Sequence, residues 1–302
     1  MKPMEIYTRT MKFVWLKLLV GAAGAVAAGL ILGLFLLLGS AFGGSAMIVF
    51  GIIGGCLGIA AWMFISYYFG YMIKAGHVAV VAYALTNGTL PENQTAWATQ
   101  MVKGRFATAN VYYVLDRLVS GAVAQLQKAV NFVTDLLKNI PGMGLLQFFA
   151  EQYISIVLGS VDECCLGWCF LHPELGSFHA SCDGVSIYFQ NAKHLLKSGL
   201  KIAGIVVGLT VAAAIPVILL SYALFHETKT AFAIALLVGL MLVMALKTAF
   251  LNSYAMIRMM ASYLEVAPNT VLSFDLYEKL CGLSAKFRKL FNRAKEEGMR
   301  AV

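Results

Sequence analysis

Two long stretches without charged residues dominate the hydrophobic and polar pattern. The first covers residues 18–73, with no Asp, Glu, Lys or Arg. One crossing of a bilayer core needs about 20 apolar residues, so this stretch is too long for a single span. Clustered Gly and Ser at 39–45 favour a turn. We therefore predict transmembrane helices over 13–38 and 46–73. The alternative for the first is a cleaved signal peptide, whose apolar core is normally about 7–15 residues, shorter than this one.

A second apolar pair lies towards the C-terminus. Residues 202–225 carry no charge, 226–229 form a short polar turn, and 231–257 are again apolar apart from Lys247. These stretches predict the third and fourth spans. The fold class is therefore all-α: a polytopic integral membrane protein of four transmembrane helices, arranged as two hairpins with a helical cytoplasmic-side or interfacial subdomain between them.

The predicted parts follow from these spans. They are an N-terminal hairpin at 1–74, an amphipathic helical region at 75–200, a C-terminal hairpin at 201–258 and a basic helical tail at 259–302. Lys and Arg gather in the N-terminal segment, the middle region and the tail, whereas the turn at 39–45 has none. The positive-inside rule then places both termini in the cytoplasm of a multi-pass protein of the cell membrane.

Composition agrees with this class. Hydrophobic residues make up 60% of the chain and charged residues 13%, where soluble domains average about 25% charged. We therefore do not expect an ordinary soluble enzyme. The net charge of +8 and the basic tail predict contact with anionic lipid headgroups. No recognisable nucleic-acid motif accompanies the tail, so we expect no nucleic acid.

The middle region has the clearest helical period. Apolar residues recur on one face over 110–139, whereas the polar face mixes acids such as Asp116 with bases such as Arg117. A helix made only for anionic lipid would be richer in Lys and Arg, so we predict that it packs on protein first. A further apolar helix over 145–161 contains Glu151. We favour a membrane-dipping or bundle-packed helix there over a fifth crossing.

Cysteine and histidine cluster after this helix. Thiolate and imidazole are zinc ligands, which makes a metal site one hypothesis for Cys164, Cys165, Cys169, His172, His179 and Cys182. The cluster has no Cys-x-x-Cys pair, so reduced buried thiols are the favoured interpretation and we expect no cofactor. A disulfide or an acylated cysteine is the remaining alternative.

Small residues at four-residue spacing mark each span, and such stripes let membrane helices approach closely. The candidate packing positions are Gly21, Gly29, Gly33, Gly51, Gly55, Gly204, Gly208 and Gly239. These stripes pack either within one bundle or against other protomers. Lys247 is the only ionisable residue well inside a predicted span, and it is either a snorkelling anchor or part of a pathway.

Three short segments resemble the choline-transporter-like family: 164–170 (CCLGWCF), 188–193 (YFQNAK) and 252–256 (NSYAM), followed by a helical basic tail. The resemblance covers about residues 105–295 and implies a membrane transporter. That family has more spans and a large extracellular loop, and none of its binding residues maps onto this chain.

The sequence leaves three functions to compare. We expect membrane transport or permeation of a small solute or lipid, performed by an oligomer because four helices enclose little space. The alternative is a non-catalytic membrane scaffold or assembly component, with a homo-oligomer or a membrane-protein partner. An enzyme would need a polar constellation that the sequence does not offer, so we expect no catalysis.

Overall fold

The computed structural model describes residues 1–106, 109–130, 159–225 and 242–298, and also residues 153, 156, 157, 227, 236, 239 and 240. These residues form helices and no strands, which confirms the all-α prediction. The described elements are α1 (Pro3–Arg9), α2 (Met11–Ser40), α3 (Gly44–Asn87), α4 (Gln94–Arg105), α5 (Ala109–Val130), α8 (Val161–Leu171), α9 (Ser177–Gln190), α10 (Ala192–Phe225), the π-helix η1 (Lys247–Leu251), α12 (Asn252–Val266), the 3-10 helix η2 (Ala267–Asn269), α13 (Phe274–Leu283) and α14 (Ala285–Glu296).

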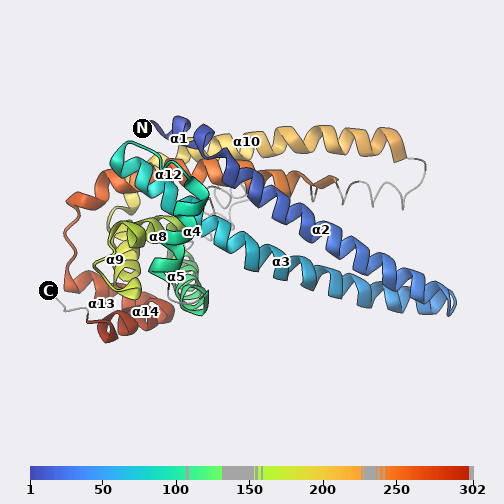
Figure 1. Ribbon diagram of the computed structural model, residues 1–302, viewed down its shortest axis with the longest axis horizontal. Coiled ribbons are helices and arrows are strands. Elements are labelled where there is room, and N and C mark those ends of the chain that lie inside the picture. The colour runs from blue at the N-terminus through green and yellow to red at the C-terminus, as the bar shows by residue number, and fades with distance from the viewer. Residues whose placement is uncertain are drawn as a thin grey trace, which may run out of the picture.

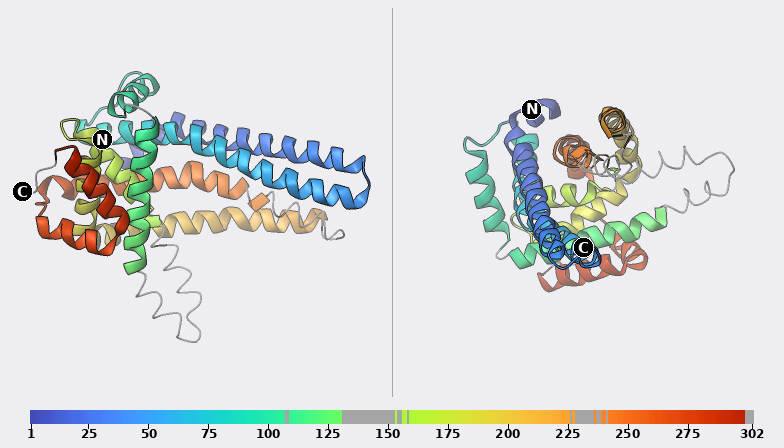
Figure 2. Two further views of the ribbon diagram at one scale, coloured as in Figure 1. Left: turned by 90° about the horizontal axis from the view of Figure 1, so that it is seen from below. Right: turned by 90° about the vertical axis from the view of Figure 1, so that its right-hand side faces the viewer.

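The molecule consists of a head of mostly shorter helices and a set of long apolar helices that project from it (Figure 1). Helices α2, α3 and α10 leave the head in one direction, and the segment leading into η1 runs beside them (Figure 2). All three helices are long and apolar enough to cross a membrane. The predicted fourth span at 231–257 falls partly outside the described residues, so the count of four stays a prediction.

The first hairpin confirms the predicted break. Helix α2 ends at Ser40, and Gly43 adopts a φ of 99° immediately before α3 begins. A residue with a side chain rarely adopts this conformation, which explains a glycine at the turn. The two helices then approach closely, because a Cβ at Gly58 would lie 2.8 Å from the carbonyl oxygen of Ala28.

Helix α3 extends beyond the predicted span 46–73. The helix continues through Lys74 to Asn87, where Gly88 ends it in the left-handed conformation. Residues beyond Lys74, such as Ala75, Val78 and Val81, are fully buried in the head. Lys74 therefore lies where α3 passes from an exposed apolar surface into the core of the head.

The head encloses the apolar face of the predicted amphipathic helix. In α5, Leu115, Leu118 and Val119 are buried in the main core. The described part of 110–139 therefore packs on protein, as predicted. Residues 131–139, and all but three residues of the region 145–158, lie outside the described residues.

The basic tail is also part of the head. Helix α14 buries Phe287, Leu290 and Phe291 in the main core and packs on α5 and α9. Helices α13 and α14 lie towards the end of the head opposite the projecting apolar helices (Figure 1). The tail is therefore helical, as predicted, but its apolar face is used for folding.

Candidate functional site

A polar network lies where α2, α3 and α12 meet at the base of the apolar helices. The Lys17 ammonium donates to the Ser253 hydroxyl at 3.0 Å and lies 3.1 Å from Nδ1 of His77. The other ring nitrogen of His77 lies 3.0 Å from the Thr10 hydroxyl. His77, Thr10 and Ser253 are all buried. The network thus joins three elements that are far apart in the sequence.

The partners of His77 determine its proton position. Thr10 donates its hydroxyl hydrogen to the Ile6 carbonyl at 2.8 Å, so its oxygen accepts from Nε2–H of His77. Nδ1 is then free to accept from the Lys17 ammonium. This arrangement satisfies both ring nitrogens of a neutral imidazole, as burial requires.

A second part of the network connects α3 to the beginning of α8. The Lys74 ammonium pairs with the carboxylates of Asp162 and Glu163, the latter at 3.2 Å. Both acids lie in the first turn of α8, where the helix dipole favours negative charge. A cavity of about 10 Å³, room for roughly one water molecule, adjoins Lys74, Asp116 and Asp162.

The carboxyl groups of this site differ in their pKa values. Burial and the neighbouring Asp162 raise the pKa of Glu163. Burial also raises the pKa of Asp162, but the attraction of Lys74 and hydrogen bonds more than offset this, so its pKa is lowered. Burial raises the pKa of Asp116. The pair therefore favours one ionised and one protonated acid beside the single ammonium of Lys74.

Sequence analysis did not identify this network. In the sequence, Lys17 and Lys74 are only the charges that border the uncharged stretch 18–73. The available signal was His77, a lone imidazole within an apolar helical stretch, but nothing in the sequence indicates its partners. Lys17 and Ser253 are separated by 236 positions, and only the folded structure brings them together.

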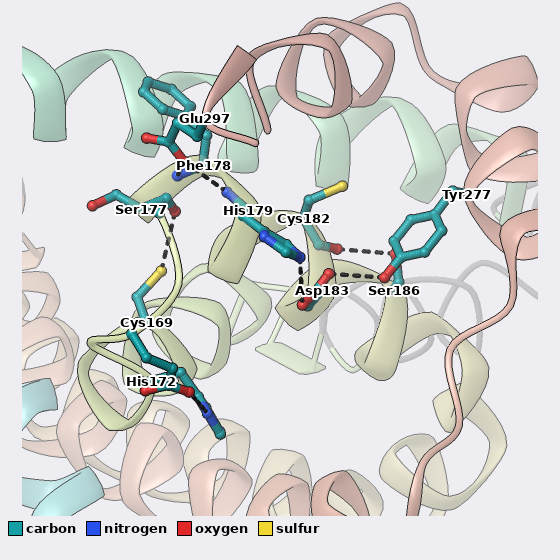
Figure 3. Close-up of polar contacts among 12 residues, drawn as sticks. Cys169, His172, Ser177, Phe178, His179, Cys182, Asp183, Ser186, Tyr277 and Glu297 are labelled. Carbon is teal, nitrogen blue, oxygen red and sulfur yellow. Dashed lines mark hydrogen bonds and ion pairs between the residues drawn. The ribbon is translucent and has the colours of Figure 1, made fainter. Parts of the chain in front are cut away.

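The predicted metal candidates lie elsewhere, on α8, directly after it at His172, and on α9. Figure 3 shows Cys169, His172, His179 and Cys182. The Cys169 thiol lies 3.0 Å from the Ser181 hydroxyl and donates to the Ser177 carbonyl at 3.4 Å. His172 instead pairs with Glu174 at 2.7 Å. The thiol and the imidazole thus have separate partners.

His179 belongs to a third arrangement. Its Nε2 lies 3.4 Å from one Asp183 carboxylate oxygen, and the Tyr277 hydroxyl donates to the other at 2.8 Å. Burial raises the pKa of both Asp183 and Tyr277. The Glu297 carboxylate accepts from the backbone N–H groups of Phe178 and His179 and so caps the beginning of α9.

The geometry gives the zinc hypothesis no support. Among the described residues, no three His, Cys, Asp or Glu side chains are grouped as metal ligands would be. The four cysteines of this region are free and buried. Burial raises the pKa of Cys164, Cys165 and Cys182 well above the usual thiol value, and that of Cys169 to about 11. They are protonated core thiols, in agreement with the favoured interpretation.

The predicted glycine positions fall into two groups. Gly51 faces Leu36, and Gly239 faces Val217, so these two contact neighbouring helices. The other six would place a Cβ in open space, with no neighbouring atom within 4 Å. These six are Gly21, Gly29, Gly33, Gly55, Gly204 and Gly208. Most of the predicted packing positions therefore have no partner helix within the described chain.

Lys247, the predicted pathway candidate, is half-buried at the start of η1. A π-helix is rare and often lies at a functional position. The contacts given above for Lys17 are with His77 and Ser253 and do not include Lys247. Its role as an anchor or as part of a pathway stays a prediction.

Comparison with known proteins found no matching family model, no matching curated protein and no matching solved structure. The resemblance to the choline-transporter-like family therefore stays a prediction from the short segments quoted above.

Proposed function

We propose that this chain is a non-catalytic membrane assembly component that functions as a homo-oligomer. The observation that supports this proposal is the contrast between the head and the apolar helices. In the most apolar stretches of α2, α3 and α10, only 6%, 11% and 17% of the residues are buried. The head, in contrast, has a continuous core.

Lipid alone could cover the exposed apolar side chains, so these side chains do not by themselves favour an oligomer over a monomer. The glycines add a second argument for an oligomer. Gly29 and Gly33 lie one turn apart on α2 with no neighbouring atom in reach. In membranes, close helix association uses such small residues. A second copy of the chain would supply a helix that packs against these glycines. The head does not need that copy to fold, because it has a core of its own.

The test measures the oligomeric state and the melting temperature of the same variants. The purified protein in mild detergent and in nanodiscs should give the mass of an oligomer by light scattering. Gly29→Leu with Gly33→Leu should release monomers, whereas the control Leu30→Ile on the same helix should not. The melting temperature of the monomers should remain near that of the parent. A parent protein that is monomeric in both environments would refute the proposal.

Transport of a small solute is the second candidate, and the Lys17–His77 network favours it. Ionisable groups at a membrane helix are costly and often functional. The probe is radiolabelled choline, chosen from the family resemblance, in liposomes containing the protein. Uptake above that of empty liposomes, lost in Lys17→Met but kept in the exposed control Lys103→Met, would support transport. Uptake equal to empty liposomes would count against choline as the solute.

A further inference from the structure

Three lysines form a basic stripe at the beginning of α10. Lys193, Lys197 and Lys201 are spaced four residues apart, which places them on one side of the helix. All three are exposed. The structure gives none of them a hydrogen bond or an ion pair with the described residues. We call these three residues the α10 lysine stripe.

Nothing in the local sequence balances this charge. After Asp183, the next acidic residue is Glu227, so α10 contains no carboxylate. The basic face of α14 differs, because Glu296 and Glu297 lie at its end. In α14, moreover, Arg288 donates to the carbonyl of Cys281. The α10 lysine stripe is therefore a basic surface without an ion-pair partner among the residues that the structure describes.

The stripe continues directly into an exposed apolar surface. Leu200, Ile205 and Leu209 are exposed on the same helix, and α10 is one of the three helices able to cross a membrane. The helix leaves the head and runs alongside the other apolar helices (Figure 2). With the apolar part of α10 in a bilayer, the lysines would lie at the level of the headgroups.

We propose that the α10 lysine stripe binds the phosphate headgroup of an anionic phospholipid in the leaflet on the side of the head. The acyl chains of this lipid lie along the exposed apolar residues of α10. The charge complementarity favours an anionic lipid over a zwitterionic one, because an ammonium near a membrane surface attracts anionic lipid. This inference requires only that α10 is in a membrane and is independent of the oligomer proposed above.

The experiment uses the full-length protein purified from mixed nanodiscs of phosphatidylcholine and phosphatidylglycerol. Native mass spectrometry measures the ratio of the two lipids that stay bound. The test variant combines Lys193→Gln, Lys197→Gln and Lys201→Gln. The control combines Lys103→Gln, Lys279→Gln and Lys289→Gln, which removes the same charge from exposed positions. Lys279 and Lys289 belong to the basic tail, but the structure places α13 and α14 towards the end of the head opposite the projecting apolar helices (Figure 1), away from the proposed lipid.

The parent should retain phosphatidylglycerol preferentially, and the test variant should lose this preference by about tenfold or more. The control should keep it. If the triple variant cannot be purified, Lys197→Gln alone is compared and should show a smaller loss. An unchanged ratio in the test variant, or an equal loss in the control, would overturn the proposal. So would equal thermal stabilisation by soluble glycerol 3-phosphate and by the lipid.

Discussion

Lys74→Met tests the ion pairs that connect α3 to α8. The substitution keeps the length of the side chain but removes the ammonium that contacts both Asp162 and Glu163. The two carboxyl groups would then lie side by side in the head without that cation. We expect a clear loss of stability.

The magnitude depends on how far water screens this site. Breaking a fully buried ion pair costs about 3–5 kcal/mol. Here the Lys74 side chain is 32% exposed and each acid is 17% exposed, and the raised pKa of Glu163 lets this acid take a proton. We therefore expect a loss of about 2 kcal/mol, because water and that proton reduce the uncompensated charge. The melting temperature should fall by about 4–8 °C.

Thermal unfolding in detergent at several pH values measures this effect. The difference between parent and variant should shrink as pH falls from about 8 to about 5, because the unpaired acids become protonated. Adding Asp162→Asn should restore more than half of the lost stability, and the control Lys103→Met should melt like the parent. A Lys74→Met protein as stable as the parent at about pH 8 would refute the reasoning.

Three further predictions concern other positions. The raised pKa of Glu163 contributes stability that is present below its unfolded-state pKa of about 4.3 and is lost as pH rises through the raised pKa. Thermal melts of Glu163→Gln should therefore depend less on pH than those of the parent from about pH 5 to about pH 8. Leu118→Asp should lose about 3–5 kcal/mol or fail to fold, because it places a charge in the core, whereas Ala124→Asp on the exposed side of α5 should elute and melt normally. In Gly58→Leu, the new Cβ would lie 2.8 Å from the backbone oxygen of Ala28 on α2, so the variant should lose about 1–3 kcal/mol of stability. In Gly55→Leu, the new Cβ meets no atom within 4 Å, so this variant should change the oligomer without lowering the stability of the monomer.

Local signals in the sequence predicted the first turn and the buried face of α5. The Gly-rich turn at 39–45 depends on backbone freedom, which is a property of the residues themselves. The buried face of α5 follows from its period. The sequence did not indicate that α3 continues to Asn87, because the segment after Lys74 is as helical as the segment before it. The two segments differ in burial, since residues after Lys74 lie in the core of the head.

The candidate site could not be predicted in the same way. A lysine at the end of an apolar helix, such as Lys17, is normally expected to reach water or headgroups. The rule fails here because α12 supplies Ser253 and α3 supplies His77, so the ammonium finds partners inside the head. The surroundings of the metal candidates could not be predicted from the sequence either. Cys169 and His172 are three positions apart, yet the thiol lies beside Ser181 and the imidazole pairs with Glu174.

The network also explains how the apolar helices can be firmly held and yet incompletely packed. Lys17, His77 and Ser253 join α2, α3 and α12 at one point. Moving one helix base would leave a buried polar group without its partner, at a cost of about 1–3 kcal/mol for each group. The bases are therefore fixed by the head, whereas the distal parts have few buried residues. Helices fixed at one end and open along their length would present a defined surface to the second copy that we propose, because the head would hold their orientation before association.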